Sequence, residues 1–245
     1  IFIIYLNCFN VNISIKFNMI LIYLTKKWWE YCLMKCLILA NGDYGEIELY
    51  KDKLSDFDKI LCADGGANYA YSLDIIPDYI IGDMDSIDGD IRAFYQARGV
   101  VFKKYPRQKD FTDTQLVIHL AEELGAKEIL FCGSLGTRLD HTLSNLYSGI
   151  NTAINGIKVT HYNPKCSIHI VAKELDIDGN IGETISVLAL TDIVTGLSEV
   201  GVEYPLEQVS LEKHNPYAIS NILSEARAKI TVDTGVIAVF HYHEG

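Results

Sequence analysis

Two aspartates separated by one residue follow an apolar segment in the stretch YIIGDMDSID, residues 79–88. Asp83, Asp85 and Asp88 place three carboxylates within six positions, in a chain whose net charge is already -11. Two such charges about 4 Å apart repel by about 4 kcal/mol at an effective dielectric constant of about 20. A divalent cation would offset this repulsion, so the stretch suggests a metal site.

Acids and glycines also follow other short apolar segments. The stretches ADGGA (63–67), KDFTD (109–113) and GSLGTRLDH (133–141) each come after a predicted strand. Ligands of open α/β sheets bind at the carboxyl ends of the strands. We therefore expect these loops to meet at one edge of a sheet and to gather six acids: Asp64, Asp83, Asp85, Asp110, Asp113 and Asp140.

Oxygen ligands without nearby Cys or His favour Mg²⁺, which binds through carboxylates and substrate phosphates. Backbone N–H groups can approach phosphates closely at glycines, and a helix beginning after Arg138 would add its positive end. The predicted ligand is a magnesium nucleotide, although no GxxxxGK[ST] motif is present and the chain is therefore not a P-loop enzyme. The glycines and cations concerned are Gly65, Gly66, Gly133, Gly136, Lys109 and Arg138.

Each motif alone has a simpler explanation. A DxD triplet is most often a solvated loop, Arg138 and Asp140 can pair at a helix end, and Gly65 with Gly66 can form a turn. His141 fits a structural hydrogen-bond partner as well as a nucleotide-site acid or base. The joint placement of the motifs at strand ends favours a metal–phosphate site.

Alternating apolar runs and helical patterns predict the elements that position these loops. Helices are expected over residues 88–98 and 140–151, and a third helix begins where Thr112 and Gln115 form a capping box and ends at Gly125. The pattern is typical of an α/β fold with a mostly parallel sheet. Its strands are expected at residues 35–40, 59–63, 79–81, 100–104 and 128–132.

Short alternating segments such as SIHIVA, TISVLAL and VIAVFHY follow residue 156, and they predict antiparallel strands in an all-β, sandwich-like unit. We therefore expect an α/β nucleotide-binding catalytic domain over residues 34–157 and a β-sandwich domain over residues 158–245. Residues 1–33 differ in composition from the rest and begin with Ile. We expect Met34 to be the natural start and residues 1–33 to be a non-core extension, because asparagines and Lys16 interrupt any run long enough for a membrane anchor.

Composition excludes several other classes. The chain is 49% hydrophobic, acidic and without a long Lys/Arg run, which argues against a nucleic-acid-binding surface. Six scattered cysteines without a CxxC pair are typical of a reduced, cytoplasmic protein. The seven histidines show no spacing with these cysteines that a structural zinc site would require.

Four motifs in this order and spacing, ADGGA, PDYIIGDMDS, KDFTDT and GSLGTRLDHTLSN, resemble thiamine pyrophosphokinases. The resemblance extends over nearly all of residues 34–245, because GVEYPLE and ISN in the C-terminal part match as well. It implies an enzyme that transfers diphosphate from ATP to the hydroxyl group of thiamine, giving thiamine diphosphate and AMP. It also implies a homodimer with active sites between subunits, without nucleic-acid or membrane partners.

The resemblance also implies roles for particular residues. Asp83, Asp85, Asp110 and Asp113 would hold Mg²⁺ and ATP phosphates, Arg138 and Asp140 would complete the catalytic nucleotide site, and Ser220 and Asn221 would bind thiamine. Asp113 is our candidate for accepting the proton of the thiamine hydroxyl. Two positions depart from the family pattern, since Thr137 replaces a common glycine and Ile222 replaces a common glutamate.

Three alternatives stay open at this point. One is another Mg²⁺-dependent diphosphokinase, for example one that acts on a pterin. The second is a nucleotide-sugar transferase that uses its DxD motif with manganese. The third is a module that binds nucleotide or thiamine without turnover, although binding alone does not need so many carboxylates.

Overall fold

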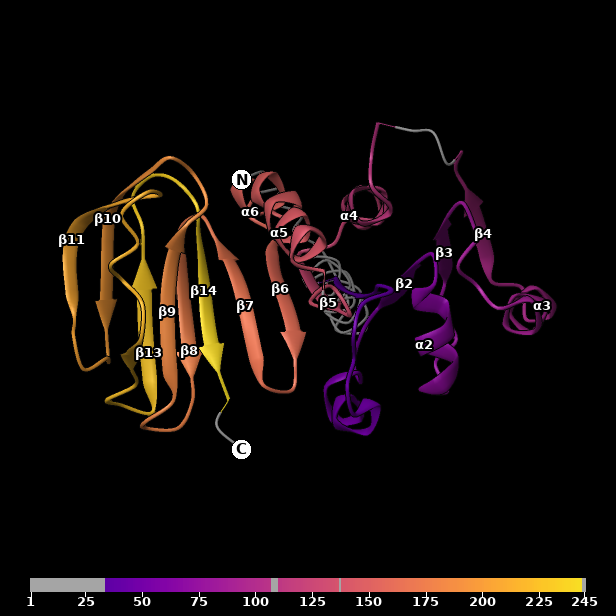
Figure 1. Cartoon of the computed structure of the whole chain (residues 1–245), viewed down its shortest axis with the longest axis horizontal. Coiled ribbons are helices and arrows are strands. Elements are labelled where there is room, and N and C mark those ends of the chain that lie inside the picture. Colours follow the sequence, from indigo (N-terminus) through magenta and orange to yellow (C-terminus); the bar gives the residue numbers. More distant parts are fainter. Residues whose placement is uncertain (1–33, 107–109, 137, 244–245) are drawn as a thin grey trace, which may run out of the picture.

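Parallel strands and helices alternate through the first half of the chain in the computed structural model, which describes residues 34–106, 110–136 and 138–243 (Figure 1). The strands of this half are β1 (Lys35–Leu39), β2 (Lys59–Ala63), β3 (Tyr79–Gly82), β4 (Val101–Lys104) and β5 (Glu128–Cys132). The helices are the 3-10 helix η1 (Ile47–Lys53), α2 (Gly66–Ser72), α3 (Gly89–Ala97), α4 (Asp113–Glu123), α5 (Leu139–Ser148) and α6 (Ile150–Ile154). The five strands run parallel in the order β5-β1-β2-β3-β4, which confirms the expected strands and the expected α/β class.

Helices cover both faces of this parallel sheet, which explains why its strands are continuous apolar runs rather than alternating ones. In β1, Cys36 and Ile38 belong to the core on the α4 side of the sheet. Leu37 and Leu39 belong to the core that contains residues of α2 and α3. Figure 1 shows α4 on one side of the strands and α2 and α3 on the other.

The expected helix start at Thr112 is confirmed in detail. The Thr112 backbone N–H donates to Oε1 of Gln115 at 2.9 Å, and the Gln115 backbone N–H donates to Oγ1 of Thr112 at 3.2 Å. Two of the otherwise unpaired N–H groups of the α4 N-terminus are thereby satisfied. Past the other end, Gly125 has a φ of +91°, the left-handed conformation that closes many helices.

The helix expected over residues 140–151 is divided into α5 and α6 at Gly149. A Cβ atom at this position would lie 3.3 Å from side-chain carbons of Val159 and Ile170. The missing side chain therefore lets the helix pair approach the strands beneath it. The expected helix over residues 88–98 is confirmed as α3.

The second half adds strands that are nearly all antiparallel, as expected. They are β6 (Lys158–Asn163), β7 (Cys166–Val171), β8 (Glu174–Asp178), β9 (Thr184–Ala189), β10 (Ile193–Val200), β11 (Leu206–Glu212), β12 (Asn221–Ile222), β13 (Arg227–Thr231) and β14 (Ile237–Tyr242). β6 pairs in parallel with β5, and β7, β14, β9 and β12 follow it, so that one ten-stranded sheet has the order β12-β9-β14-β7-β6-β5-β1-β2-β3-β4. The sheet therefore continues across the predicted domain boundary at residues 157/158.

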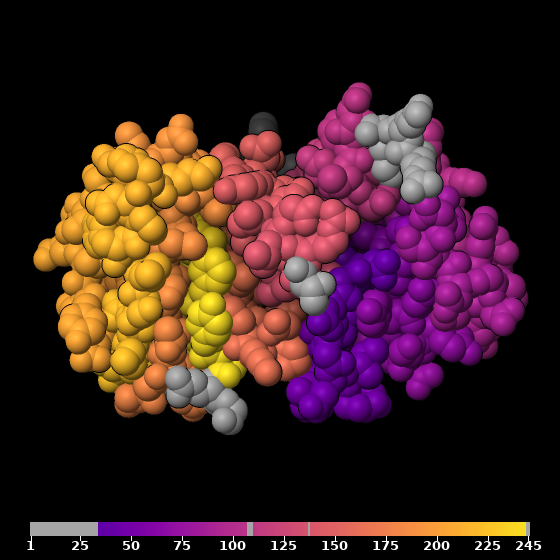
Figure 2. Space-filling view, in the orientation of Figure 1, coloured from indigo at the N-terminus to yellow at the C-terminus, as the bar shows by residue number. Residues whose placement is uncertain are grey.

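A second sheet of four strands, β11-β10-β13-β8, packs on the β12-β9-β14 end of the long sheet. Their shared core includes Ile185 and Val239 from the long sheet and Leu197 and Ile230 from the short one. This confirms the expected β-rich second half. Figure 2 shows it in orange and yellow at one end of the molecule, with the first half in indigo and magenta at the other.

The described cysteines are isolated thiols. Cys36, Cys62, Cys132 and Cys166 are buried and form no disulfide. Burial raises the pKa of the Cys166 thiol to about 11, which suppresses the reactive thiolate at neutral pH. They pack as small apolar side chains. No helix in residues 34–106, 110–136 or 138–243 combines the length and the hydropathy needed to cross a membrane.

Glu199 is an acid inside the sandwich, with 1% of its surface exposed. Its Oε1 has no hydrogen-bond partner among the described residues, whereas Oε2 accepts from Nδ2 of Asn221 at 3.2 Å. Burial raises the pKa of Glu199 to about 7, although the hydrogen bond from Asn221 lowers it. The folded protein therefore keeps a proton that the unfolded chain releases near the ordinary value of 4.5.

Stability should fall as the pH rises from about 4.5 to about 7, because over this interval the folded state binds more protons than the unfolded state. The variant Glu199→Gln carries no titrating proton there. We expect its urea midpoint to exceed that of the wild type at about pH 8 and to approach it at about pH 4.5. An equal difference at both pH values would contradict the raised pKa.

Candidate active site

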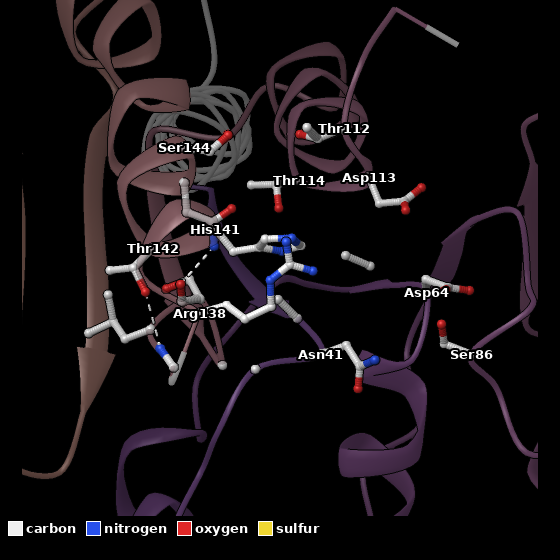
Figure 3. A pocket seen from close by; sticks show the side chains of 18 of the residues that line it. Asn41, Asp64, Ser86, Thr112, Asp113, Thr114, Arg138, His141, Thr142 and Ser144 are labelled. Atoms are coloured by element: carbon white, nitrogen blue, oxygen red, sulfur yellow. Dashed lines mark hydrogen bonds between the residues drawn. The ribbon is translucent and has the colours of Figure 1, made fainter. Parts of the chain in front are cut away.

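The carboxyl ends of the parallel strands open into a cavity of about 990 Å³. Its walls are the loops that follow β1, β2, β3 and β5, together with the first turns of α4 and α5. The volume is at the upper end of the range of about 300–1,000 Å³ for small-molecule sites. Figure 3 shows Asp64, Ser86 and Asp113 on one side of it and Arg138 and His141 on the other.

Two glycines allow the loops after β1 and β5 to touch. A Cβ atom on Gly42 would lie 2.1 Å from the carbonyl oxygen of Gly133, and Gly133 itself has a φ of +67°. The hydroxyl of Tyr44 adds a link by donating to the carbonyls of Ala40 at 3.1 Å and Cys132 at 3.2 Å. This close contact fixes one wall of the cavity.

The variant Gly42→Ala should separate these loops by forcing the Gly133 carbonyl away. We expect kcat/KM to fall by about 100-fold with little loss of folded protein, because displacements of about 1 Å in a site can have effects of that size. Steady-state kinetics and circular dichroism would measure both. Gly89→Ala is the matched control, since nothing lies within 4 Å of a Cβ atom there. Wild-type kinetics in folded Gly42→Ala would contradict the role of this contact.

Asp64, Asp83 and Asp85 form a cluster of carboxylates; Asp64 and Asp83 line one side of the cavity, and the exposed Asp85 lies outside the lining. Each offers an oxygen within 4.8 Å of those of the other two. The geometry follows from the sheet, because β2 and β3 are parallel neighbours in which Ala63 pairs with Ile81. The residues that follow the two strands must therefore lie side by side.

Asp64 is the buried member of this cluster, with 8% of its surface exposed. Its Oδ1 has no hydrogen-bond partner among the described residues. Burial raises the pKa of Asp64, a hydrogen bond with Ser86 lowers it, and the charges of Asp113, Asp83 and Asp85 raise it further. A bound cation would give Oδ1 a partner and reverse the repulsion, so these carboxylates fit a hard, oxygen-binding ion such as Mg²⁺.

The structure gathers only part of the predicted metal set of Asp83, Asp85, Asp110 and Asp113. Asp113 begins α4 and lines the cavity, and its Oδ1 lies 3.2 Å from the position of a Cβ atom on Gly82. Asp110 is exposed and outside the cavity lining. Asp64, one of the six acids expected at the sheet edge, joins Asp83 and Asp85, and its expected role in ATP binding stays a prediction. The metal-binding roles stay predictions.

Positive charge enters the cavity from the start of α5. Arg138 is the only lysine or arginine among the described residues of the lining, and its Nη2 lies 2.6 Å from Oδ2 of Asp140. The hydrogen bond from Arg138 holds the pKa of Asp140 below its ordinary value. Both side chains are exposed, so a phosphate could replace Asp140 as the partner of Arg138 at little cost. His141 lines the same wall, and Lys109 lies outside the described residues.

The predicted phosphate-binding glycines fall into two groups. Gly133 and Gly136 line the cavity, as a role in phosphate binding requires. Gly65 and Gly66 do not. A Cβ atom on Gly66 would lie 2.0 Å from the carbonyl oxygen of Leu39, so this glycine is needed where α2 packs on β1.

Sequence reasoning missed several polar residues of the lining. Asn41 and Asp43 follow β1, and the strand-end rule that located Asp64 and Asp83 would have found them had it been applied to the first strand. Ser134 follows β5 within the GSLGTRLDH stretch, so the same rule covers it, whereas Asn145 inside α5 carries no strand-end signal. Nδ2 of Asn145 donates to the Ser134 carbonyl at 2.7 Å, which ties α5 to the loop after β5.

The predicted thiamine-binding pair lies away from this cavity. Asn221 begins β12, the edge strand at the far end of the long sheet, and neither it nor Ser220 lines the cavity. The Asn221 side chain is buried and internally bonded: Oδ1 accepts from the backbone of Tyr204 at 3.0 Å, and Nδ2 donates to the Tyr204 carbonyl at 2.9 Å. In this chain Asn221 thus holds the loop at Tyr204, while Ser220 is exposed.

Comparison with known protein families gives two matches. The model described as "Thiamin pyrophosphokinase, catalytic domain" matches residues 50–161, and "Thiamin pyrophosphokinase, vitamin B1 binding domain" matches residues 165–237. Only residues 162–164 separate the two matches, which together extend over most of the chain.

Curated relatives and solved structures agree with these matches. Thiamine pyrophosphokinase of Bacillus subtilis (strain 168) is 29% identical over 168 residues, 66% of this chain and 77% of the relative. Thiamine pyrophosphokinase 1 of Oryza sativa subsp. japonica is 26% identical over 203 residues, 72% and 76% of the two chains. The crystal structure of the Bacillus subtilis protein has a TM-score of 0.75 at 24% identity, and the match covers 86% of this chain and 100% of that one. The crystal structure of the yeast thiamin pyrophosphokinase has a TM-score of 0.67 at 19% identity, and the match covers 87% of this chain and 89% of that one. These two structures share the fold of this chain.

Proposed function

Because the chain belongs to the thiamine pyrophosphokinase family, we propose that it transfers the terminal diphosphate of ATP to the hydroxyl group of thiamine, giving thiamine diphosphate and AMP. One observation carries this proposal most directly. The carboxylates of Asp64 and Asp83, with Asp85 clustered beside them, lie at the same strand-end cavity as Arg138 and the glycine loop after β5. Anionic and cationic groups around one space suit a metal-bound polyphosphate.

Asp64, Asp83, Asp85 and Asp113 would hold Mg²⁺, which, when bound, would neutralise charge on the phosphates. Backbone N–H groups near Gly133 and Gly136 would contact phosphate oxygens. Arg138 would leave Asp140 to pair with a phosphate, and His141 lies beside it for a further hydrogen bond. The other predicted contacts, Asp110 and Lys109, lie at the KDFTD segment before α4, where Asp110 is exposed and Lys109 is outside the described residues.

In the proposed reaction, the hydroxyl oxygen of thiamine attacks the β-phosphorus of ATP. The bond from that phosphorus to the oxygen shared with the α-phosphate breaks, AMP leaves with that oxygen, and the hydroxyl loses its proton. Asp113 is our candidate proton acceptor, because it lines the cavity at the start of α4. A nearly unchanged rate in Asp113→Asn would remove it from that role.

We also propose that the active site is completed by a second copy of the chain. β12 is five strand spacings from β5, or about 24 Å along the sheet at about 4.8 Å per spacing. Ser220 therefore lies well away from the phosphate end of its own cavity. Near Ser220, the apolar side chains of Tyr204 and Ile219 are 65% and 50% exposed. Beside the cavity, Leu139 is 73% exposed. A homodimer would cover these surfaces and bring thiamine-binding and ATP-binding residues together.

The direct test uses the purified full chain with ATP, Mg²⁺ and thiamine, and detects the products by mass. We expect thiamine diphosphate and AMP in equal amounts. Formation of ADP would indicate transfer of a single phosphate. Binding of both substrates without any product would instead support a sensing module and overturn the proposed activity.

A cytoplasmic location agrees with these properties. The described cysteines are buried thiols, as in proteins of a reduced compartment. The net charge of -11 disfavours association with nucleic acid.

A further inference from the structure

A second group of potential metal ligands lies where β14 ends. His241 and His243 are two residues apart in this extended segment, so their side chains lie on the same face of the sheet. Tyr242 pairs with Thr184 of the neighbouring β9, which places Glu183 opposite His243. One potential ligand atom from each of Glu183, His241 and His243 lies within 4.8 Å of the other two.

The three side chains are held in place by their neighbours. Glu183 and His241 are buried, and Nε2 of His241 lies 2.6 Å from Oε2 of Glu183. Asn180 fixes the same carboxylate through its backbone N–H at 3.0 Å and its side-chain amide at 2.9 Å. Oγ of Ser167 lies 2.8 Å from Nε2 of His243 and orients that ring. Outer contacts of this kind orient the ligands of metal sites.

This cluster is separate from the active-site cavity, because none of its three ligands belongs to the cavity lining. Its donors differ as well. Two imidazoles and one carboxylate suit Zn²⁺, whereas the all-oxygen cluster of Asp64, Asp83 and Asp85 suits Mg²⁺. A purely structural Glu–His hydrogen bond would need only His241, and the adjacent ring of His243 supplies the third ligand.

We propose that Glu183, His241 and His243 bind one Zn²⁺ ion, with water as the fourth ligand. Three protein ligands and one water are a common zinc coordination set. The ion would take the place of the hydrogen bond between His241 and Glu183, with neutral imidazole and carboxylate as its ligands. The bound ion would join the end of β14 to the turn before β9.

The test begins with the full chain, stripped of metal with a chelator. Equilibrium dialysis then measures its Zn²⁺ binding. Excess Mg²⁺ is present so that Zn²⁺ does not bind at the all-oxygen cluster of Asp64, Asp83 and Asp85. Co²⁺ then serves as a spectroscopic probe, since nitrogen ligands in a tetrahedral site give it strong visible absorption. We expect one tight Zn²⁺ ion per chain and a tetrahedral Co²⁺ spectrum. His243→Ala should weaken Zn²⁺ binding at least about 100-fold, because loss of an outer-shell partner alone costs about 10- to 100-fold.

His214→Ala is the matched control, since His214 also lies beside a carboxylate, Glu212 at 3.0 Å, but has a side chain that is 83% exposed. It should bind Zn²⁺ like the wild type. The wild-type measurement alone can overturn the proposal: no tight Zn²⁺ ion and no tetrahedral Co²⁺ spectrum would show that the cluster is a hydrogen-bonded structural group only. Wild-type affinity in folded His243→Ala would overturn it equally.

Discussion

Asp83→Asn and Asp85→Asn are each expected to lower kcat at least about 100-fold without loss of the fold. Each change keeps the size of the side chain but removes one charge from the carboxylate cluster, and the loss of one well-placed electrostatic group costs about 100- to 1,000-fold in turnover. The defect should be largest at limiting Mg²⁺. Steady-state kinetics over a Mg²⁺ titration would measure it.

A stability measurement separates a metal-binding role from a structural one. Removing one of several repelling carboxylates should leave the melting temperature without Mg²⁺ unchanged or slightly higher, and should reduce the increase that Mg²⁺ produces in the wild type. Asp88→Asn is a suitable control, because Asp88 is a nearby exposed acid that does not belong to the cluster of Asp64, Asp83 and Asp85. Wild-type rates in folded Asp83→Asn and Asp85→Asn would rule out a metal-binding role for these residues.

Combining two inactive variants in one dimer should restore activity if each active site uses two subunits. Asp83→Asn damages the ATP-binding half, and Asn221→Ala removes the side chain that holds the loop at Tyr204 in the proposed thiamine-binding half. In a mixed dimer, one site carries both defects and the other carries neither. Random pairing of equal amounts should therefore regain about one quarter of the wild-type rate from two nearly inactive parents.

The matched control combines Asp83→Asn with Asp85→Asn, since both changes damage the same half and every site then carries a defect. This mixture should stay inactive. Differently tagged chains, co-expressed and purified by both tags, would isolate the mixed dimer and yield about half of the wild-type rate. If each chain formed its own active site, the mixed dimer would remain as inactive as its parents.

Local sequence signals predicted the strand-end site because they depend on short-range physics. The apolar runs of β2 and β3 place Asp64 and Asp83 just after the ends of these strands. Because β2 and β3 pair in parallel, the two loops that follow them must lie side by side. The capping box at Thr112 fixed the start of α4 in the same way. Both features can be predicted from residues close together in the sequence and from the rule that ligands bind at the carboxyl ends of parallel strands.

Features that depend on long-range pairing could not be read from the chain. The cluster of Glu183, His241 and His243 forms only because β14 lies next to β9, across more than fifty residues of sequence. The burial of Glu199, in β10 of the four-stranded sheet, likewise depends on the long sheet that packs against it, from which Asn221 of β12 donates to its carboxylate. The spacing of histidines and cysteines along the sequence gives no sign of a carboxylate that strand pairing brings beside two histidines.

The continuous ten-stranded sheet limits how this protein can be divided. A fragment that ends at residue 157 would lack β6 and leave the open edge of β5 in water, and the complementary fragment would expose β6. Unpaired edges of this kind promote intermolecular strand pairing and aggregation. The two halves, although they carry separate family signatures, should therefore be expressed and refolded as one polypeptide.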